Sequence, residues 1–193
     1  MIDNPDYSTS TIRLLVFQAL KHWETKALFS LLSDEDYIVR SATARELQTR
    51  GEEDTFQNLK DLAEDPIAYV REIAAFTLGQ LGTPEYPFRE QSIPLLQEFL
   101  SDDDSEVRAA AVAAFGHLCT DSIPEGVEKK LVEMVVDQSE EVRECLAFTL
   151  GSSSGSEEVV AALTRLQKDN SEGVRSWADI GFELLERKNG VRS

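Results

Sequence analysis

One short pattern recurs five times along the chain, and this repetition constrains the fold more than any other feature. A Val-Arg pair is repeated, and an aspartate stands six residues before each arginine. Successive arginines are 31, 37, 35 and 32 residues apart. The aspartate and arginine pairs are Asp34 and Arg40, Asp65 and Arg71, Asp102 and Arg108, Asp137 and Arg143, and Asp169 and Arg175. Self-similarity at such a period predicts a solenoid, in which each unit stacks on the next.

The residues around each arginine predict a turn followed by a helix. A carboxylate just before a helix can accept hydrogen bonds from the unpaired N–H groups of the first turn and faces the positive end of the helix dipole. In repeat two, Val70, Ala74 and Leu78 are four residues apart and share one helix face, and Gly79 follows where the helix ends. A guanidinium has five N–H donors, so we expect the arginines to bind turn carbonyls and aspartates as a structural ladder along the stack. A catalytic or phosphate-binding role is the alternative, but one arginine in every repeat is what a structural role requires.

The sequence therefore predicts an all-α fold, an α-solenoid of about five two-helix repeats, in a single domain over residues 1–193. A helix from Thr9 to Lys21 precedes the repeats as a terminal cap, with Ile12, Leu15 and Val16 facing inward. The predicted helix pairs are Trp23–Leu32 with Tyr37–Arg50, Asp54–Ala63 with Pro66–Leu81, Ile93–Leu100 with Ser105–Leu118, Gly126–Val136 with Ser139–Leu150, and Glu157–Gln167 with Glu172–Arg187.

Two segments break the regular period. Residues 82–92 contain a glycine and two prolines, which predicts a loop. Tyr86 and Phe88 within it either pack over the edge of the solenoid or are displayed for binding. The run from Gly151 to Gly155 predicts a flexible connector.

The core D-x5-R-x2-A-A-x2-L-G resembles the HEAT-repeat family, in the short form also found in phycobilin-lyase-like repeats. The resemblance covers about residues 21–187 and is most specific in repeats two and four. In repeat three Phe115-Gly116 replaces Leu-Gly, and in repeat five Trp177 and Asp179 interrupt the pattern. The resemblance implies a stack whose second helices line the concave surface.

A narrower resemblance concerns residues 28–54 (LFSLLSDEDYIVRSATARELQTRGEED), residues 74–81 (AAFTLGQL) and residues 174–179 (VRSWAD). These stretches resemble HEAT-repeat immunity proteins encoded beside bacterial Rhs-type polymorphic toxins. The resemblance implies a protein that binds and neutralises a cognate toxin domain. It carries over no toxin-contacting residue, because the motif that matches is the structural one. A general scaffold in a protein assembly and a phycobilin-lyase-like pigment-binding protein are the alternatives.

The net charge of −17 constrains the partner. It argues against nucleic acid, because a phosphate backbone requires a basic face. Two interpretations remain: an acidic surface that keeps the protein soluble and monomeric when free, or one that attracts a basic protein, such as a basic toxin domain. No run of 18 apolar residues predicts a membrane span, and the first residues lack the pattern of a secretory signal, which predicts the cytoplasm.

Motifs for catalysis are missing from the sequence. There is no glycine-rich phosphate loop, no H-E-x-x-H and no C-x-x-C. His22 and His117 belong to different repeats. Cys119 and Cys145 are predicted to be small residues of the core or of a groove. The Asp102–Asp104 run lacks the glycine and distal glutamate of a calcium loop, so it favours helix capping. We therefore predict no enzyme activity, no cofactor and no metal.

The second helix of each repeat predicts a candidate binding face. Positions one, two, five and nine after the arginine point away from the stack on an ideal helix. They hold Arg45 in repeat one, Glu72, Ile73, Phe76 and Gln80 in repeat two, Glu144, Cys145 and Phe148 in repeat four, and Ser176, Trp177 and Ile180 in repeat five. The large apolar residues among them are either a second core stripe, with Trp177 covering the end of the array, or aromatic anchors of a groove with an acidic rim.

Overall fold

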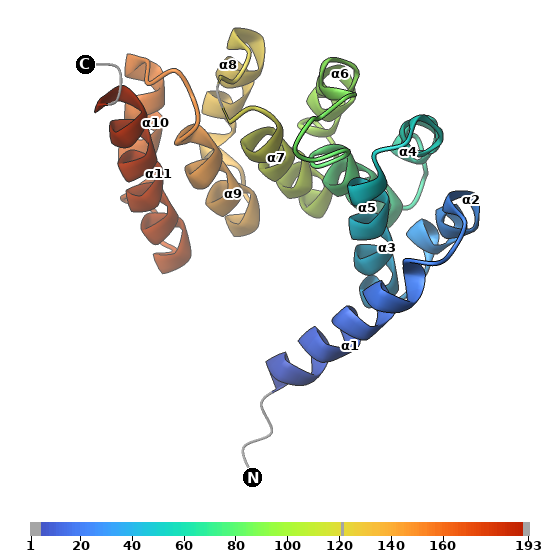
Figure 1. Cartoon of the computed structure of the whole chain (residues 1–193). Coiled ribbons are helices and arrows are strands. Elements are labelled where there is room, and N and C mark those ends of the chain that lie inside the picture. The colour runs from blue at the N-terminus through green and yellow to red at the C-terminus, as the bar shows by residue number, and fades with distance from the viewer. Residues whose placement is uncertain (1–4, 121, 191–193) are drawn as a thin grey trace. The chain divides into compact units, whose positions relative to one another are not determined.

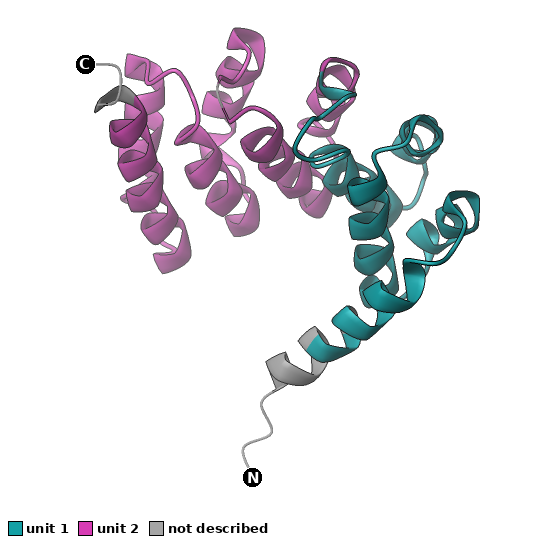
Figure 2. Cartoon of the chain, viewed as in Figure 1, with its two compact units in different colours: residues 1–89 teal, residues 90–193 magenta. Residues whose placement is uncertain are grey.

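The computed structural model describes residues 5–120 and 122–190. Over these residues the chain is all-α, with eleven α-helices, two short 3-10 helices and no strand (Figure 1). The predicted α-solenoid of two-helix repeats with an N-terminal helix is confirmed. The helices form two compact units, residues 1–89 and 90–193 (Figure 2). The single domain over residues 1–193 stays a prediction.

Unit 1 contains the N-terminal helix and the first two repeats. Its elements are α1 (Pro5–Leu20), α2 (Thr25–Leu28) continued by the 3-10 helix η1 (Phe29–Ser33), α3 (Tyr37–Arg50), α4 (Glu53–Ala63) and α5 (Ala68–Leu78). Within it, α1 packs on α3, α4 on α5, and α3 on α5. Leu28, Leu32, Leu47 and Leu59 are fully buried and form part of the core of this unit.

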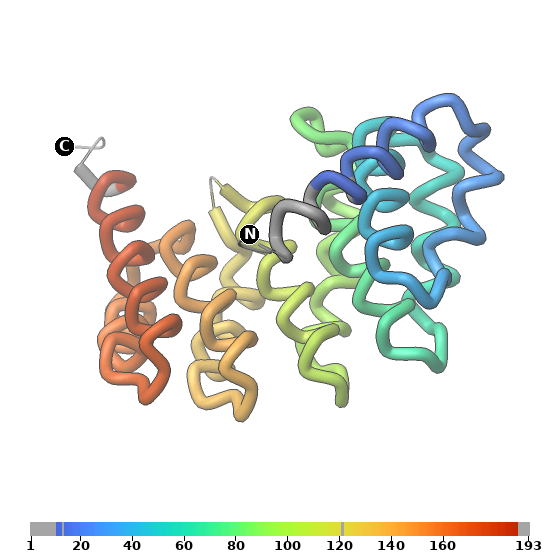
Figure 3. The backbone as a smooth tube through the Cα atoms, turned by 90° about the horizontal axis from the view of Figure 1, so that it is seen from below, coloured from blue at the N-terminus to red at the C-terminus, as the bar shows by residue number. Residues whose placement is uncertain are grey.

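Unit 2 contains the last three repeats. Its elements are α6 (Arg89–Phe99), which begins at the boundary, α7 (Ser105–Leu118), α8 (Glu125–Glu133) continued by the 3-10 helix η2 (Met134–Val136), α9 (Glu140–Leu150), α10 (Glu157–Leu166) and α11 (Glu172–Gly190). The second helices α7, α9 and α11 lie side by side (Figure 3). Gly181 of α11 permits this approach, because a Cβ added there would collide with the carbonyl oxygen of Ala147 on α9.

The repeated aspartates organise the turns between the helices of each pair. The carboxylate of each accepts a hydrogen bond from the backbone N–H two residues later, at 2.8 Å in Asp34 and Asp65 and 2.9 Å in Asp102, Asp137 and Asp169. The helix itself is capped by a later side chain in several repeats. Such turn and cap bonds give the Asp102–Asp104 run a local structural use.

The expected inward face of the N-terminal helix is wrong in part. Ile12 is 48% exposed and Leu15 is 64% exposed. The buried end of α1 is its C-terminal turn, where Leu20 is buried and its carbonyl accepts a hydrogen bond from Arg50 Nη2 on α3. The helical period shows which residues share one face of a helix, but it does not show which turns of that helix pack against a neighbouring helix.

The two irregular segments are both anchored. In the loop before α6, Phe88 is buried and stacks on Phe56 of α4, with ring centroids 4.9 Å apart and planes 9° from parallel. The packed alternative therefore holds for Phe88, whereas Tyr86 is half-buried.

The segment 151–155, predicted to be a flexible connector, is tied down at two points. Ser154 donates from its backbone N–H and its Oγ to the carboxylate of Glu128, both at 2.7 Å. Lys188 Nζ donates to the carbonyls of Ser152 and Ser153.

Candidate protein-binding face

The arginines of unit 2 link consecutive repeats. Arg108 donates from Nε and Nη2 to both carboxylate oxygens of Asp137 at 2.8 and 2.9 Å, and its Nη1 bonds the carbonyls of Asp102 and Asp103. Arg143 does the same one repeat later with Asp169, at 2.7 and 3.0 Å. Each guanidinium thus binds the backbone of its own turn and the carboxylate of the next turn, in the bidentate geometry that arginine favours.

These ion pairs shift the ionisation of both partners. The Arg143 hydrogen bond holds the pKa of Asp169 below its ordinary value, although burial opposes this. Burial also acts to raise the pKa of Asp137, but hydrogen bonds from Arg108 and the Ser139 amide lower it overall. The carboxylates in turn raise the pKa of Arg108 and Arg143. The arginines are therefore held in structural contacts.

Both unit 1 arginines, Arg40 and Arg71, keep the carbonyl contact, and Arg40 differs from Arg108 and Arg143 in its second contact. Arg40 Nη1 donates to the carbonyls of Asp34 and Glu35, and Arg71 Nη1 donates to the carbonyl of Asp65. The Arg40 guanidinium carbon lies 4.4 Å from the ring centroid of Tyr69. A guanidinium stacks readily on an aromatic face, so Tyr69 takes the place that a carboxylate has in unit 2.

The second-helix face of unit 1 contains a pocket. It has a volume of about 380 Å³, and it brings together Arg45 of α3 with Phe76 of α5 and with Gln80, all three of which the sequence assigned to partner binding. Gln48, missed by the helix-position rule, fixes its wall by donating to the carbonyl of Phe76 at 2.8 Å. Phe17 of α1 completes the lining, and no period within the repeats could have identified it.

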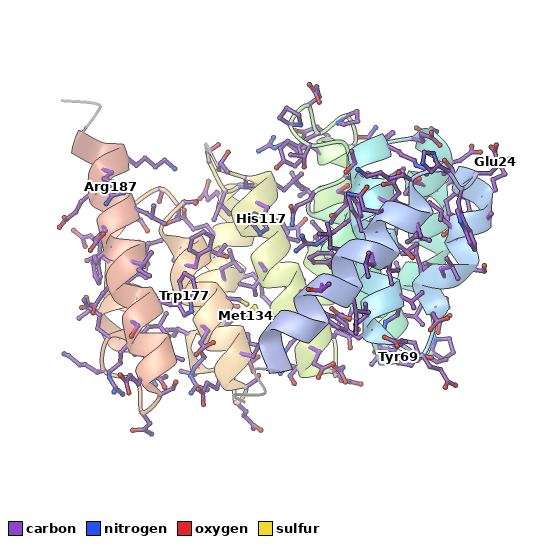
Figure 4. All side chains as sticks on the ribbon, turned by 60° about the horizontal axis from the view of Figure 1, so that its bottom comes forward. Glu24, Tyr69, His117, Met134, Trp177 and Arg187 are labelled. Carbon is purple, nitrogen blue, oxygen red and sulfur yellow. The ribbon has the colours of Figure 1, made fainter. Side chains whose placement is uncertain are left out.

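The second-helix face of unit 2 carries an aromatic patch. Phe148 of α9 and Trp177 of α11 meet edge to face, with ring centroids 5.6 Å apart and planes at 79°. Trp177, labelled in Figure 4, is 40% exposed. Ile180 is 39% exposed, so both large side chains keep much of their surface in water. We refer to Phe148, Trp177 and Ile180 as the aromatic patch.

The prediction for Ile73 is wrong, because this side chain is 1% exposed and belongs to the core. It stands two positions after its arginine, and Ala42 at the same position in repeat one is also buried. Cys145 at this position is half-buried, and only Trp177 is exposed. The position faces the neighbouring second helix, and in the described part of the chain no further repeat follows α11 to cover Trp177.

The remaining predicted residues lie on the helices at intermediate depth. Glu72 and Glu144 are half-buried, and Ser176 is exposed. The Glu144 carboxylate lies over Gly173 in the first turn of α11, where any added side chain would collide with it. Glu144 therefore contacts the neighbouring repeat within unit 2 as well as bordering the aromatic patch.

The titratable groups on this face do not form a reactive site. Burial and then the nearby Glu141 and Glu144 raise the pKa of the Cys145 thiol to about 11, so the thiol is protonated at neutral pH. Partial burial lowers the pKa of His117 on α7, which lies in a different repeat from Trp177 (Figure 4). Among the described residues no group of three or more His, Cys, Asp and Glu is arranged to hold a metal ion, and none of the helices described there is long and apolar enough to cross a membrane.

The HEAT-repeat pattern matches residues 25–116 and 93–181, which together include most of the chain. The chain belongs to the HEAT-repeat family. It is similar to protein YibA of Escherichia coli K12, with 28% identity over 178 residues, which are 90% of this chain and 62% of YibA. The chain thus spans less than two thirds of this relative. The X-ray structure of YibA aligns with a TM-score of 0.74 and 27% identity, over 87% of this chain and 61% of that one.

Two other HEAT-like or armadillo structures share the fold. A designed armadillo repeat protein in complex with the peptide (KR)4 aligns with a TM-score of 0.54 at 19% identity, over 88% of this chain and 90% of that one. The CpcE and CpcF complex of phycocyanin lyase from Nostoc sp. PCC7120 aligns with a TM-score of 0.54 at 23% identity, over 77% of this chain and 91% of that one. The chain is a HEAT or armadillo-like repeat scaffold, and this type of fold is typical of proteins without enzyme activity.

Proposed function

We propose that this scaffold binds a basic protein through its second-helix face, with the aromatic patch as the anchor in unit 2. The observation that carries the proposal is the edge-to-face pair of the half-buried Phe148 and the exposed Trp177, beside the exposed Ile180. A tryptophan at this exposure leaves a large apolar area that a partner can cover. Aromatic side chains dominate the binding energy of protein interfaces.

The charges near the patch favour a cationic partner. Glu141 and Glu144 act electrostatically on Cys145 of the same helix, and Asp179 of α11 stands between Trp177 and Ile180 in sequence. Asp179 accepts a hydrogen bond from Gln167 Nε2 at 2.7 Å, which holds its carboxylate in place. A Lys or Arg side chain on the partner could therefore pair with a carboxylate while it lies over an aromatic ring. The net charge of −17 would accelerate encounter with such a partner.

The more specific proposal is that the chain is an immunity protein that binds and neutralises a cognate, basic bacterial toxin domain. The resemblance of residues 28–54, 74–81 and 174–179 supports it, and so does the acidic surface. A general scaffold in a protein assembly would co-purify with several partners. A phycobilin-lyase-like protein would bind a pigment and shift its absorption.

The test is rescue of cells that express a toxin domain encoded beside this chain. We expect the chain to restore growth and to bind the purified domain, and Trp177→Ala to weaken that binding by about tenfold or more. Trp23→Ala is the matched control, because Trp23 is a 48% exposed tryptophan that belongs to unit 1 and not to the aromatic patch.

Equal loss of binding in both variants, or loss of thermal stability together with binding in Trp177→Ala, would count against the aromatic patch. Binding without rescue of growth would contradict the immunity role but would agree with a general protein-binding scaffold. An absorption shift of a bilin on addition of the chain would favour the pigment alternative.

A further inference from the structure

A second candidate surface lies on the first helices of unit 2. Two adjacent cavities, of about 700 and 620 Å³, lie between α8 and α10 and share Val132 and Glu158 in their walls. Their apolar lining comes from Ile123, Val132, Val135, Ala161 and Ala162. We refer to the two cavities together as the α8–α10 groove. None of its residues belongs to the aromatic patch on the second helices.

The groove has a local cause in the sequence. Helix α10 presents two alanines, Ala161 and Ala162, where a larger side chain would fill the space against α8. The loop before α10 cannot collapse into the gap, because Glu128 holds Ser154 through two hydrogen bonds of 2.7 Å.

Unit 1 shows how the chain itself fills space beside a first helix. There Phe88 from the loop after α5 lies flat on Phe56 of α4 and is only 9% exposed. The walls of the α8–α10 groove include no aromatic residue. A bulky apolar side chain supplied from outside would occupy the groove as Phe88 occupies the space beside α4. The volume of each cavity, about 700 and 620 Å³, lies within the roughly 300–1,000 Å³ of ligand pockets.

The groove also has a charge pattern along its length. Glu125, Glu133 and Glu158 are exposed along the α8 side and the start of α10, where they outnumber the basic Lys129 of the same cavity wall. Arg165 and Lys168 border the other end. The complementary ligand therefore has a basic residue next to its apolar residue, on the side of the three glutamates.

We propose that the α8–α10 groove is a docking site for a segment of a partner protein in which an aromatic side chain is flanked by Lys or Arg. A second copy of this chain is a poorer occupant, because two chains of net charge −17 repel each other. The site is separate from the aromatic patch, so the two can succeed or fail independently.

Two labelled peptides test the groove in the intact chain. The first is an eight-residue peptide with a central Phe-Leu pair and two lysines on its N-terminal side; the second has two glutamates in place of the lysines. Fluorescence anisotropy should show the lysine peptide binding at least about tenfold more tightly, with a preference that weakens as salt is added. Equal binding of the two peptides, or binding of neither, would overturn the proposal.

Variants then locate the binding. Ala161→Trp fills the groove and should reduce affinity for the lysine peptide by about tenfold or more. Ala161→Gln is the second variant and should act in the same direction if the tryptophan variant melts early. Glu158→Gln should lower the preference for lysine over glutamate. Trp177→Ala should leave peptide binding unchanged, because that residue belongs to the aromatic patch.

Two results would contradict this assignment. One is loss of peptide binding in Trp177→Ala but not in Ala161→Trp, which would move the peptide to the second-helix face. The other is a dimer, seen by ultracentrifugation, that Ala161→Trp converts to monomer, since the occupant would then be a second copy.

Discussion

Arg40 of unit 1 shares the carbonyl contact of the repeated motif with Arg108 and Arg143 of unit 2 but differs from them in its second contact. In unit 2, Arg108 and Arg143 take the carboxylate of the next repeat in bidentate pairs. In unit 1, Arg40 stacks on Tyr69 instead. Tyr69 stands two residues before the next arginine, a position that holds Glu141 or Gly173 in unit 2. The comparison teaches that the carbonyl contact is the constant part of the motif and that the neighbouring repeat decides the rest.

The units also differ in how they fill space beside their first helices. Unit 1 uses Phe88 from its own loop, and unit 2 leaves the α8–α10 groove between small side chains. The same repeat architecture therefore leaves no open space beside Phe56 of α4 in unit 1, whereas it leaves the α8–α10 groove open in unit 2. Stability measurements on single variants test both differences between the units.

The largest effect is expected from Phe88→Ala in unit 1. The change removes a buried ring stacked on Phe56, so the free energy of unfolding should fall by about 3 kcal/mol or more in urea melts. Ile180→Ala is the control in unit 2 and should change it by no more than about 0.5 kcal/mol, because that side chain is half-exposed. If Phe88→Ala lowered the free energy of unfolding by no more than Ile180→Ala does, the packing of the Phe88 ring would not be needed for stability.

Gly181→Ala should have the next largest effect. Its new Cβ would meet the Ala147 carbonyl oxygen, so α9 and α11 must separate, and we expect a loss of about 2 kcal/mol. Gly126→Ala is the matched control, because a Cβ there meets nothing within 4 Å, and a gain of up to about 1 kcal/mol is expected. Thermal melts of both variants measure the pair. Equal melting temperatures would show that unit 2 does not need the close approach.

The variants Asp169→Asn and Asp65→Asn test the difference between the second contacts of Arg143 in unit 2 and Arg40 in unit 1. Asp169 accepts both N–H groups of Arg143, whereas the ring of Tyr69 takes the corresponding face of Arg40. We expect a loss of about 1.5–3 kcal/mol for Asp169→Asn, as for hydrogen bonds to charged groups, and about 1 kcal/mol or less for Asp65→Asn. Native-state hydrogen exchange measures the free energy of opening of the helices in each unit separately. A larger cost for Asp65→Asn would reverse the comparison.

Acid should weaken the ladder of unit 2, with the smallest effect of the four. Arg143 lowers the pKa of Asp169, and Arg108 helps to lower that of Asp137 against the effect of burial. A carboxyl whose pKa is lower in the folded state stabilises fully above its unfolded pKa of about 3.9, and this stability is lost as the pH falls through the folded pKa. Exchange protection of α9 and α11 should therefore decrease below about pH 4, and Asp169→Asn should reduce that decrease. An unchanged acid response in the variant would mean that other carboxylates carry it.

Much of the repeat architecture could be predicted from local pattern. The structure begins and ends α3 at Tyr37 and Arg50 and α7 at Ser105 and Leu118, as predicted from the sequence. These bounds follow from turn-forming aspartates and helical period, which act within a few residues. The helix-position rule also selected Arg45, Phe76 and Gln80, which meet in the unit 1 pocket.

The errors fall where a distant neighbour decides. Ile73 is buried and Trp177 is exposed at the same position of the repeat, and no second helix follows α11 in the described chain to cover Trp177. Ile12 and Leu15 of α1 have the right period, yet both side chains are exposed.

Local sequence determines the two-helix unit, its period and the aspartates that form each turn. The hydrogen bonds of the turns and the faces of the helices depend only on residues close together in the chain. Only the tertiary structure decided which carboxylate or ring each arginine meets, that Phe88 fills its own gap, and that the α8–α10 groove stays open. Those outcomes depend on side chains about 26 to 32 residues apart that the stacking brings into contact, and a period cannot specify how large the neighbour will be.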